Sequence, residues 1–201
     1  MKKLSPSLKA VFYLIVIIWL FFGIQSVFHY NFQTLGIYPR MWKGLIGILF
    51  APFIHSSLEH IAYNTVPLFI LSLMLAIVHP KKGILIWWIL VVVSGFFVWV
   101  VGKLGYHCGS SYLIFAIAGY LISYGIFRRN ALSLIIALVT AGIYGAFLWG
   151  ILPQKEWMSW QNQLIGFVAG LIVGYVWGRI DRKKSVKQVQ AQNQQQSQSL
   201  S

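Results

Sequence analysis

Three polar clusters each open an apolar stretch of this chain, and their residue types could carry out nucleophilic chemistry. The clusters are His55-x4-His60-x3-Asn64, Gly109-Ser110-Ser111 and Gln161-Asn162-Gln163. A serine hydroxyl attacks a carbonyl when a base takes its proton, and nearby imidazole, amide or N–H groups stabilise the oxyanion that forms. No histidine follows His107 in the chain, so the third cluster offers amides, which do not titrate near neutral pH.

The elements that carry these clusters are long apolar runs. The runs cover residues 8–28, 46–54 leading into 58–78, 84–101, 111–127, 131–152 and 161–178. Most approach the roughly 20 residues that a helix needs to cross a bilayer. Residues 46–54 are too short to span and are expected to form an interfacial or re-entrant piece. With 58% hydrophobic and 9% charged residues, the chain is predicted to be an all-α membrane protein with six transmembrane helices.

Charge predicts the orientation. Six spans place both termini on one side, and 12 of the 16 basic residues fall on that side. These residues are Lys2, Lys3, Lys9, Lys81, Lys82, Arg128, Arg129, Arg179, Arg182, Lys183, Lys184 and Lys187; the other side has Arg40, Lys43, Lys103 and Lys155. The positive-inside rule therefore predicts an N-in/C-in topology. The net charge of +13 is explained by topology, so no nucleic-acid partner is expected.

This topology brings the polar clusters to one membrane depth. The second, fourth and sixth spans run inward, so their first residues all lie near the external surface. His60 and Asn64 share a helix face there, Ser111 begins the fourth span and Gln163 the sixth. Polar groups are costly in hydrocarbon, and a convergent set indicates a functional site. The histidines at span ends, His29 and His79, are instead expected to be interfacial anchors.

Small residues predict how two of the spans pack. The sixth presents glycine at every fourth position, and the fourth presents a parallel row with the same spacing. The rows are Gly166, Gly170, Gly174 and Gly178, and Ser111, Phe115, Gly119 and Ser123. Such stripes allow close helix approach in membranes. Packing them together would bring Gln163 close to Ser111.

These residues resemble the rhomboid intramembrane serine proteases over about residues 10–178. The second span matches the family's histidine–asparagine motif in His55-Ser-Ser-Leu-Glu-His60-Ile-Ala-Tyr-Asn64. The family's Gly-x-Ser-Gly reads Gly109-Ser110-Ser111-Tyr112, and Gln163-Leu-Ile-Gly166-Phe-Val-Ala-Gly170 keeps both glycines of the sixth span but not its histidine. The segments Tyr38-Pro39-Arg40, His107 and Ser159-Trp160 look like a short bacterial subgroup. The resemblance implies a six-helix rhomboid-like bundle in the bacterial inner (cell) membrane.

The resemblance also implies a mechanism without metal or cofactor. Ser111 would be the nucleophile toward transmembrane segments of other membrane proteins, within the lipid bilayer. His60, Asn64 and the backbone N–H of Ser111 would stabilise the oxyanion. Supporting positions are His55, Gly109, His107, Tyr112, Phe115, Gly166 and Gly170.

Two departures from the family pattern bear on activity. Gln163 stands at the base position, or Phe167 in a shifted alignment, and neither can accept the serine proton. Tyr112 replaces the glycine after the serine, where a substrate backbone would approach. Proteolysis is therefore expected to be weak or lost. The alternative is an active endopeptidase that uses Ser111 with another base such as His107.

A transporter or channel is disfavoured, because Glu59 is the one acidic residue that could lie in a span and it stands at an end. The single cysteine, Cys108, excludes an intrachain disulfide and a cysteine-based metal cluster. We expect one membrane domain over residues 1–180, followed by a basic and then Gln/Ser-rich tail, residues 181–201, that is disordered. The substrate and the oligomeric state are left open.

Overall fold

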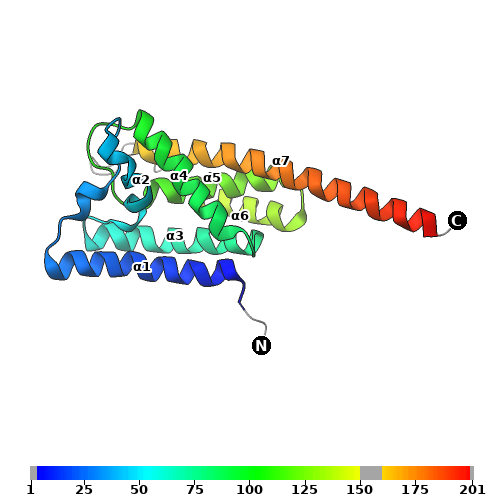
Figure 1. The fold of residues 1–201 in the computed structure, drawn as a ribbon, viewed down its shortest axis with the longest axis horizontal. Coiled ribbons are helices and arrows are strands. Elements are labelled where there is room, and N and C mark those ends of the chain that lie inside the picture. The colour runs from blue at the N-terminus through cyan, green and yellow to red at the C-terminus, as the bar shows by residue number, and fades with distance from the viewer. Residues whose placement is uncertain (1–3, 150–159, 200–201) are drawn as a thin grey trace.

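The computed structural model describes residues 4–149 and 160–199, and in this part of the chain six long helices form a bundle. They are α1 (Pro6–Phe28), α3 (Leu58–Val78), α4 (Gly83–Val101), α5 (Ser111–Arg128), α6 (Ala131–Trp149) and α7 (Trp160–Ser199). Figure 1 shows that the N-terminus and the C-terminal tail leave from the same end of the bundle. We call this the basic end; the opposite end, which carries the starts of α3, α5 and α7, is the site end.

Short helices fill the chain between α1 and α3 at the site end (Figure 1). They are η1 (Phe32–Leu35), η2 (Trp42–Leu45), α2 (Gly47–Phe50) and η3 (Ala51–Phe53). Residues 46–54 therefore form brief turns, as the sequence predicts for a piece too short to span. Pro52 stands in the first turn of η3, where the backbone N–H that proline lacks is not needed.

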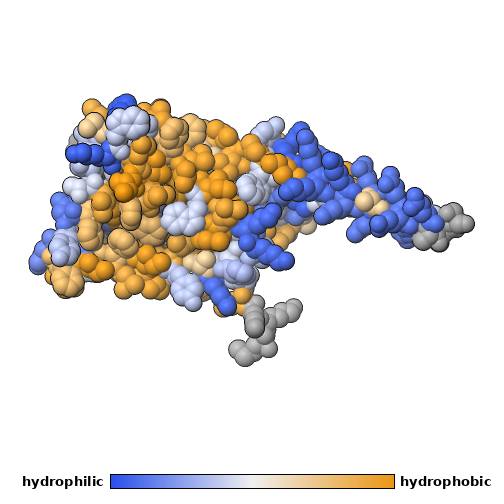
Figure 2. All heavy atoms as spheres, viewed as in Figure 1, coloured by the Kyte–Doolittle hydropathy of each residue, from blue (hydrophilic) through white to orange (hydrophobic). Residues whose placement is uncertain are grey.

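The long helices have the surface of an integral membrane protein. Five of them, α1, α3, α4, α5 and α7, are long and apolar enough to cross a bilayer, and the described side chains of α6 form a shorter apolar helix. Figure 2 shows that the face of the bundle in view is largely hydrophobic, with hydrophilic residues at its ends and on the tail. The predicted all-α membrane bundle is confirmed. The six-span count and the N-in orientation stay predictions, and the predicted end of one span at residues 150–152 lies outside the described residues.

Helix α5 is the centre of the bundle. Every residue from Tyr112 to Leu121 is buried, and α3, α4, α6 and α7 all pack against it. Glycines on α7 allow this packing, because a β-carbon at Gly166 or Gly170 would collide with the carbonyl oxygen of Tyr112 or Ala116. The predicted contact of the two small-residue stripes is thus present. It fixes the register between the fourth and sixth spans of the sequence.

His79 is not the interfacial anchor that the sequence predicts. His79 is buried, with 7% of its surface exposed, and its Nε2 lies 2.8 Å from the hydroxyl of Tyr120. Its carbonyl accepts a hydrogen bond from Ser7, whose hydroxyl in turn accepts from the backbone N–H of Gly83. The prediction is wrong because the partner, Tyr120, lies 41 residues further along the chain and the local sequence around His79 does not indicate it.

The structure continues α7 into the tail, for which the composition predicts disorder, and that disorder stays a prediction. Helix α7 runs for 40 residues, about 60 Å, and residues 181–199 continue it beyond the bundle (Figure 1). The Tyr124 hydroxyl donates to Asp181 at 3.0 Å, and Arg128 donates to Ser185 at 2.6 Å. These bonds start the extension, and the lysines and glutamines that follow are good helix formers with no glycine or proline among them.

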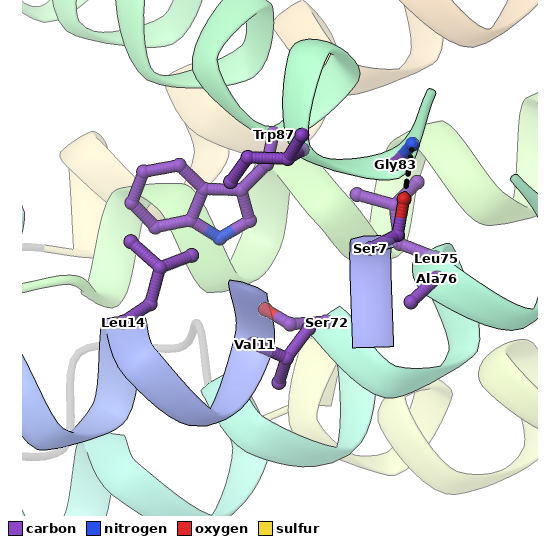
Figure 3. Close-up of a pocket in the computed structure, with 9 residues that line it drawn as sticks. Ser7, Val11, Leu14, Ser72, Leu75, Ala76, Gly83 and Trp87 are labelled. Carbon is purple, nitrogen blue, oxygen red and sulfur yellow. Dashed lines mark hydrogen bonds between the residues drawn. The ribbon is translucent and has the colours of Figure 1, made fainter. Parts of the chain in front are cut away.

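A small cavity lies between α1, α3 and α4 toward the basic end (Figure 3). Its volume is about 10 Å³, which suffices for roughly one water molecule. Ser72 and Trp87 line it, and the Ser72 hydroxyl and the Trp87 indole N–H are buried without a hydrogen-bond partner. The cavity is too small for a larger ligand and is remote from the polar clusters of the sequence.

Candidate functional site

The first polar cluster is positioned by the start of α3. Ser57 caps this helix by accepting a hydrogen bond from the backbone N–H of His60 at 3.1 Å. Such a cap suits a helix that must begin abruptly after a loop. His60 is half-buried, with its Nδ1 3.2 Å from the hydroxyl of Ser56. Asn64 follows one turn deeper, where its side-chain nitrogen is buried with no hydrogen-bond partner.

His55 lies behind His60 as a buried neutral ring. The two rings meet edge to face with centroids 5.0 Å apart, and the carbonyl of His55 accepts from Gln25 of α1 at 3.0 Å. Neither ring nitrogen of His55 makes a hydrogen bond of ordinary geometry. Burial above all, and then repulsion from His60, lower the pKa of His55 to about 3, while the backbone of Phe53 opposes the shift. His55 is therefore uncharged at neutral pH.

The second cluster meets the first at Gly109. This residue has a φ of +95°, and its N–H donates to the carbonyl of Ala51 at 2.9 Å. A β-carbon at Gly109 would lie 2.5 Å from Nε2 of His60 and 3.5 Å from the side-chain nitrogen of Asn64. Only glycine fits both the backbone conformation and the space. The predicted convergence of these two clusters is present in the structure.

The serines stand at the first turn of α5. Ser110 is the N-cap residue, fully buried, with a hydroxyl that has no hydrogen-bond partner. Ser111 is the first helical residue and is half-buried. Backbone N–H groups at a helix start lack intrahelical partners and favour negative charge. The place is thus suited to holding a carbonyl oxygen or an oxyanion beside Asn64.

The packing of α7 on α5 surrounds the two residues predicted for the base position. Gly166 packs on the carbonyl of Tyr112, directly after Ser111, whereas Phe167 directs its backbone carbonyl at Gly119. Gln163 lies one turn before Gly166 on α7 and is buried, with 6% of its surface exposed. Which of the two, Gln163 or Phe167 in the shifted alignment, stands at the base position stays a prediction.

Asn162 contacts a residue that the sequence does not connect to it. Its side-chain nitrogen lies 2.7 Å from Nδ1 of His107, and Nε2 of the same ring lies 2.7 Å from the carbonyl of Lys103. Both nitrogens of His107 are therefore engaged away from Ser111. The sequence signal was an amide at the start of an apolar helix, but it did not identify the partner.

Two further predicted positions, Tyr112 and Phe115, lie in the core of the bundle. Tyr112 and Phe115 are both buried, at 2% and 8% exposure, and the hydroxyl of Tyr112 has no hydrogen-bond partner. The side chain of Tyr112 thus packs inside the bundle. Within residues 4–149 and 160–199, no three histidine, cysteine or acidic side chains are grouped closely enough to hold a metal ion.

Comparison with known proteins fits this arrangement. A family model described as the rhomboid domain matches residues 40–180, which include all three polar clusters. An uncharacterized protein of Mycobacterium tuberculosis is 32% identical over 157 residues, covering 74% of this chain and 65% of the relative. An uncharacterized protein of Mycobacterium leprae is 28% identical over 169 residues, covering 80% and 67%. The chain thus spans a little under two thirds of the Mycobacterium tuberculosis relative. With the domain matched over most of its length, the chain belongs to the rhomboid family.

Proposed function

We propose that this rhomboid-family membrane protein engages transmembrane segments of other proteins at the site formed by Ser111, His60 and Asn64, and that its proteolysis is weak or lost. The observation that carries the proposal is the register of α7. Gly166 packs on the carbonyl of Tyr112, the residue after Ser111, and this contact supports Gln163, one turn before Gly166, as the residue at the base position. An amide cannot take up the serine proton near neutral pH.

The surroundings of Asn64 support the binding of a substrate carbonyl. Asn64 has a buried side-chain N–H₂ without a partner, and Gly109 packs against His60 and Asn64. The start of α5 adds backbone N–H groups. Loss of a base costs orders of magnitude in rate, whereas such donors leave binding and some residual catalysis. The site is therefore better equipped for binding a carbonyl than for cleaving next to it.

The second candidate, an active endopeptidase with His107 as base, has less support. One ring nitrogen of His107 bonds the Lys103 carbonyl and the other bonds Asn162. To serve Ser111, the ring would have to leave both partners. The bacterial inner membrane as the location and the N-in orientation are part of the first proposal.

The test is hydrolysis and binding in the same vesicles. The full chain is reconstituted with a fluorescent model transmembrane peptide, and both cleavage and energy transfer are followed. We expect energy transfer above that of an unrelated membrane protein, weakened by Asn64→Leu, and negligible cleavage that Ser111→Ala leaves unchanged. Cleavage abolished by Ser111→Ala would establish the active enzyme instead. Energy transfer no greater than that of the unrelated protein would overturn the binding proposal.

A further inference from the structure

The loop that precedes the serines is held from two directions. We call residues 102–110 the serine loop. His107 and Ile37 exchange two backbone hydrogen bonds, of 3.0 and 2.8 Å, and Gly109 bonds the carbonyl of Ala51. These bonds tie the loop to the segment between α1 and α3. The hydrogen bond between His107 and Asn162 connects the loop to α7.

The two bonds of the His107 ring determine where its proton lies. The carbonyl of Lys103 can only accept, so Nε2 must carry the proton that it donates over 2.7 Å. In the neutral ring Nδ1 then has a free lone pair and accepts from the N–H₂ of Asn162. The amide is oriented with its N–H₂ toward the ring, and its oxygen, Oδ1, is buried without a hydrogen-bond partner. The tautomer of His107 and the orientation of Asn162 thus fix each other.

We propose that Asn162 and His107 form a positioning pair, which holds the serine loop on the first turn of α7 and so sets Ser111 against this helix. Below the serine, the seam between α5 and α7 is closed by Gly166 on the Tyr112 carbonyl. Above it, the pair supplies the matching contact. Ser111 is placed between the two.

The pair also explains why an amide beside the base position is useful in a chain without the base. Asn162 and Gln163 are adjacent and both buried. Asn162 donates its N–H₂ to the ring of His107 in the serine loop. The importance of Ser111 rests on the proposed function, but the tautomer and the loop contact do not.

The first measurement is nitrogen NMR of protein labelled with ¹⁵N-histidine, at a pH where free histidine is neutral. The signals of His107 are assigned by their absence in His107→Gln. We expect Nε2 to be protonated and the Nδ1 resonance to be displaced upfield by its accepted hydrogen bond. Asn162→Ala should remove that displacement, and Gln161→Ala, an amide on the same turn, should keep it. A ring protonated at Nδ1, or an Nδ1 signal indifferent to Asn162→Ala, overturns the pair.

The second measurement uses the only cysteine of the chain as a reporter of the loop. Cys108 follows His107 and is half-buried, with its thiol 3.5 Å from the carbonyl of Gln33. If the pair holds the loop, Asn162→Ala and His107→Ala should each raise the rate of thiol alkylation several-fold, and Gln161→Ala should leave it unchanged. Unchanged alkylation in both variants rejects the positioning role.

The two readouts separate this inference from the proposed function. Neither requires cleavage or substrate binding, so an active protease would leave both outcomes intact. Conversely, a protein that binds transmembrane peptides can still fail both measurements. If Asn162→Ala does not fold, the tautomer of the parent and the alkylation of His107→Ala still decide.

Discussion

Gly166 packs directly on the backbone carbonyl of Tyr112, the residue that follows Ser111. This contact joins the candidate nucleophile to the helix that carries Gln163. It is a contact of backbone on backbone, so it does not depend on rotamers. The spacing between α5 and α7 at the site is therefore set by the absence of a side chain.

Adding one methyl group at this contact should open the seam. Gly166→Ala brings a β-carbon against the Tyr112 carbonyl, and neither backbone can give way without shifting a helix. We expect a loss of about 1–3 kcal/mol in the free energy of unfolding, measured by denaturation in mixed micelles.

The matched control is Gly23→Ala in α1, where a β-carbon meets nothing within 4 Å. That change should be neutral or stabilising, because alanine favours a helix by about 1 kcal/mol over glycine. Equal losses in both variants would mean that α5 and α7 are not closely packed at Gly166.

Restoring an imidazole at the base position should restore chemistry at the serine. Gln163→His places a titratable ring on a helix already in register with Ser111, so a serine-directed fluorophosphonate should label the variant faster than the parent. Labelling is measured by in-gel fluorescence, and Ser111→Ala should abolish it. A parent that already labels strongly at Ser111 contradicts the assignment of Gln163 as the lost base.

Combining this change with Tyr112→Gly would clear the predicted substrate path, but the structure adds a cost. Tyr112 is buried, and deleting a buried aromatic side chain costs about 3–5 kcal/mol. The gain in labelling should therefore be clearest at low temperature, with folding checked in parallel. A folded double variant that stays unlabelled would show that the site has changed at more than these two positions.

His55 should make the protein sensitive to acid. Its folded pKa of about 3 lies below the unfolded value of 6.5, so the unfolded chain binds the proton first. The contribution of neutral His55 to the free energy of unfolding is fully present above pH 6.5. It falls by about 1.4 kcal/mol for each pH unit as the pH drops from 6.5 toward 3. Unfolding free energy against pH measures this slope.

A His55→Phe variant keeps an aromatic ring in the buried site and has no proton to bind. Its stability should fall less steeply between pH 6.5 and 4 than that of the parent. Parallel curves for the two proteins would assign the acid sensitivity to other groups.

The sequence predicts the bundle well because its signals are local or periodic. Apolar run lengths place α3, α4 and α5 within a residue or two, and the glycine spacing of α7 predicts its contact with α5. The approach of Gly109 to His60 and Asn64 follows from the same reasoning about membrane depth. Each of these conclusions needs only the position of a residue along one helix.

What the sequence does not predict are pairs of polar residues on different helices. His79 with Tyr120 and His107 with Asn162 are 41 and 55 residues apart. A histidine at a span end gives no local indication of whether it faces water or a tyrosine. The same limit applies to the tail. Its composition predicts disorder, but composition cannot indicate that Asp181 and Ser185 have hydrogen-bond partners on α5.

The tail offers a direct comparison of the two descriptions. Arg182, Lys183, Lys184 and Lys187 are trypsin sites, and a helix resists cleavage because the protease needs an extended backbone. In the structure, Tyr124 and Arg128 hold the start of the tail by their hydrogen bonds to Asp181 and Ser185. We expect slow cleavage of the parent and several-fold faster cleavage of a Tyr124→Phe/Ser185→Ala variant, followed by mass spectrometry. Ser197→Ala is the control, since its hydroxyl bonds only the carbonyls of Asn193 and Gln194 within the tail. If trypsin removes the tail of the parent as fast as that of the double variant, these two contacts do not hold it and the disorder that the composition predicts is the better description.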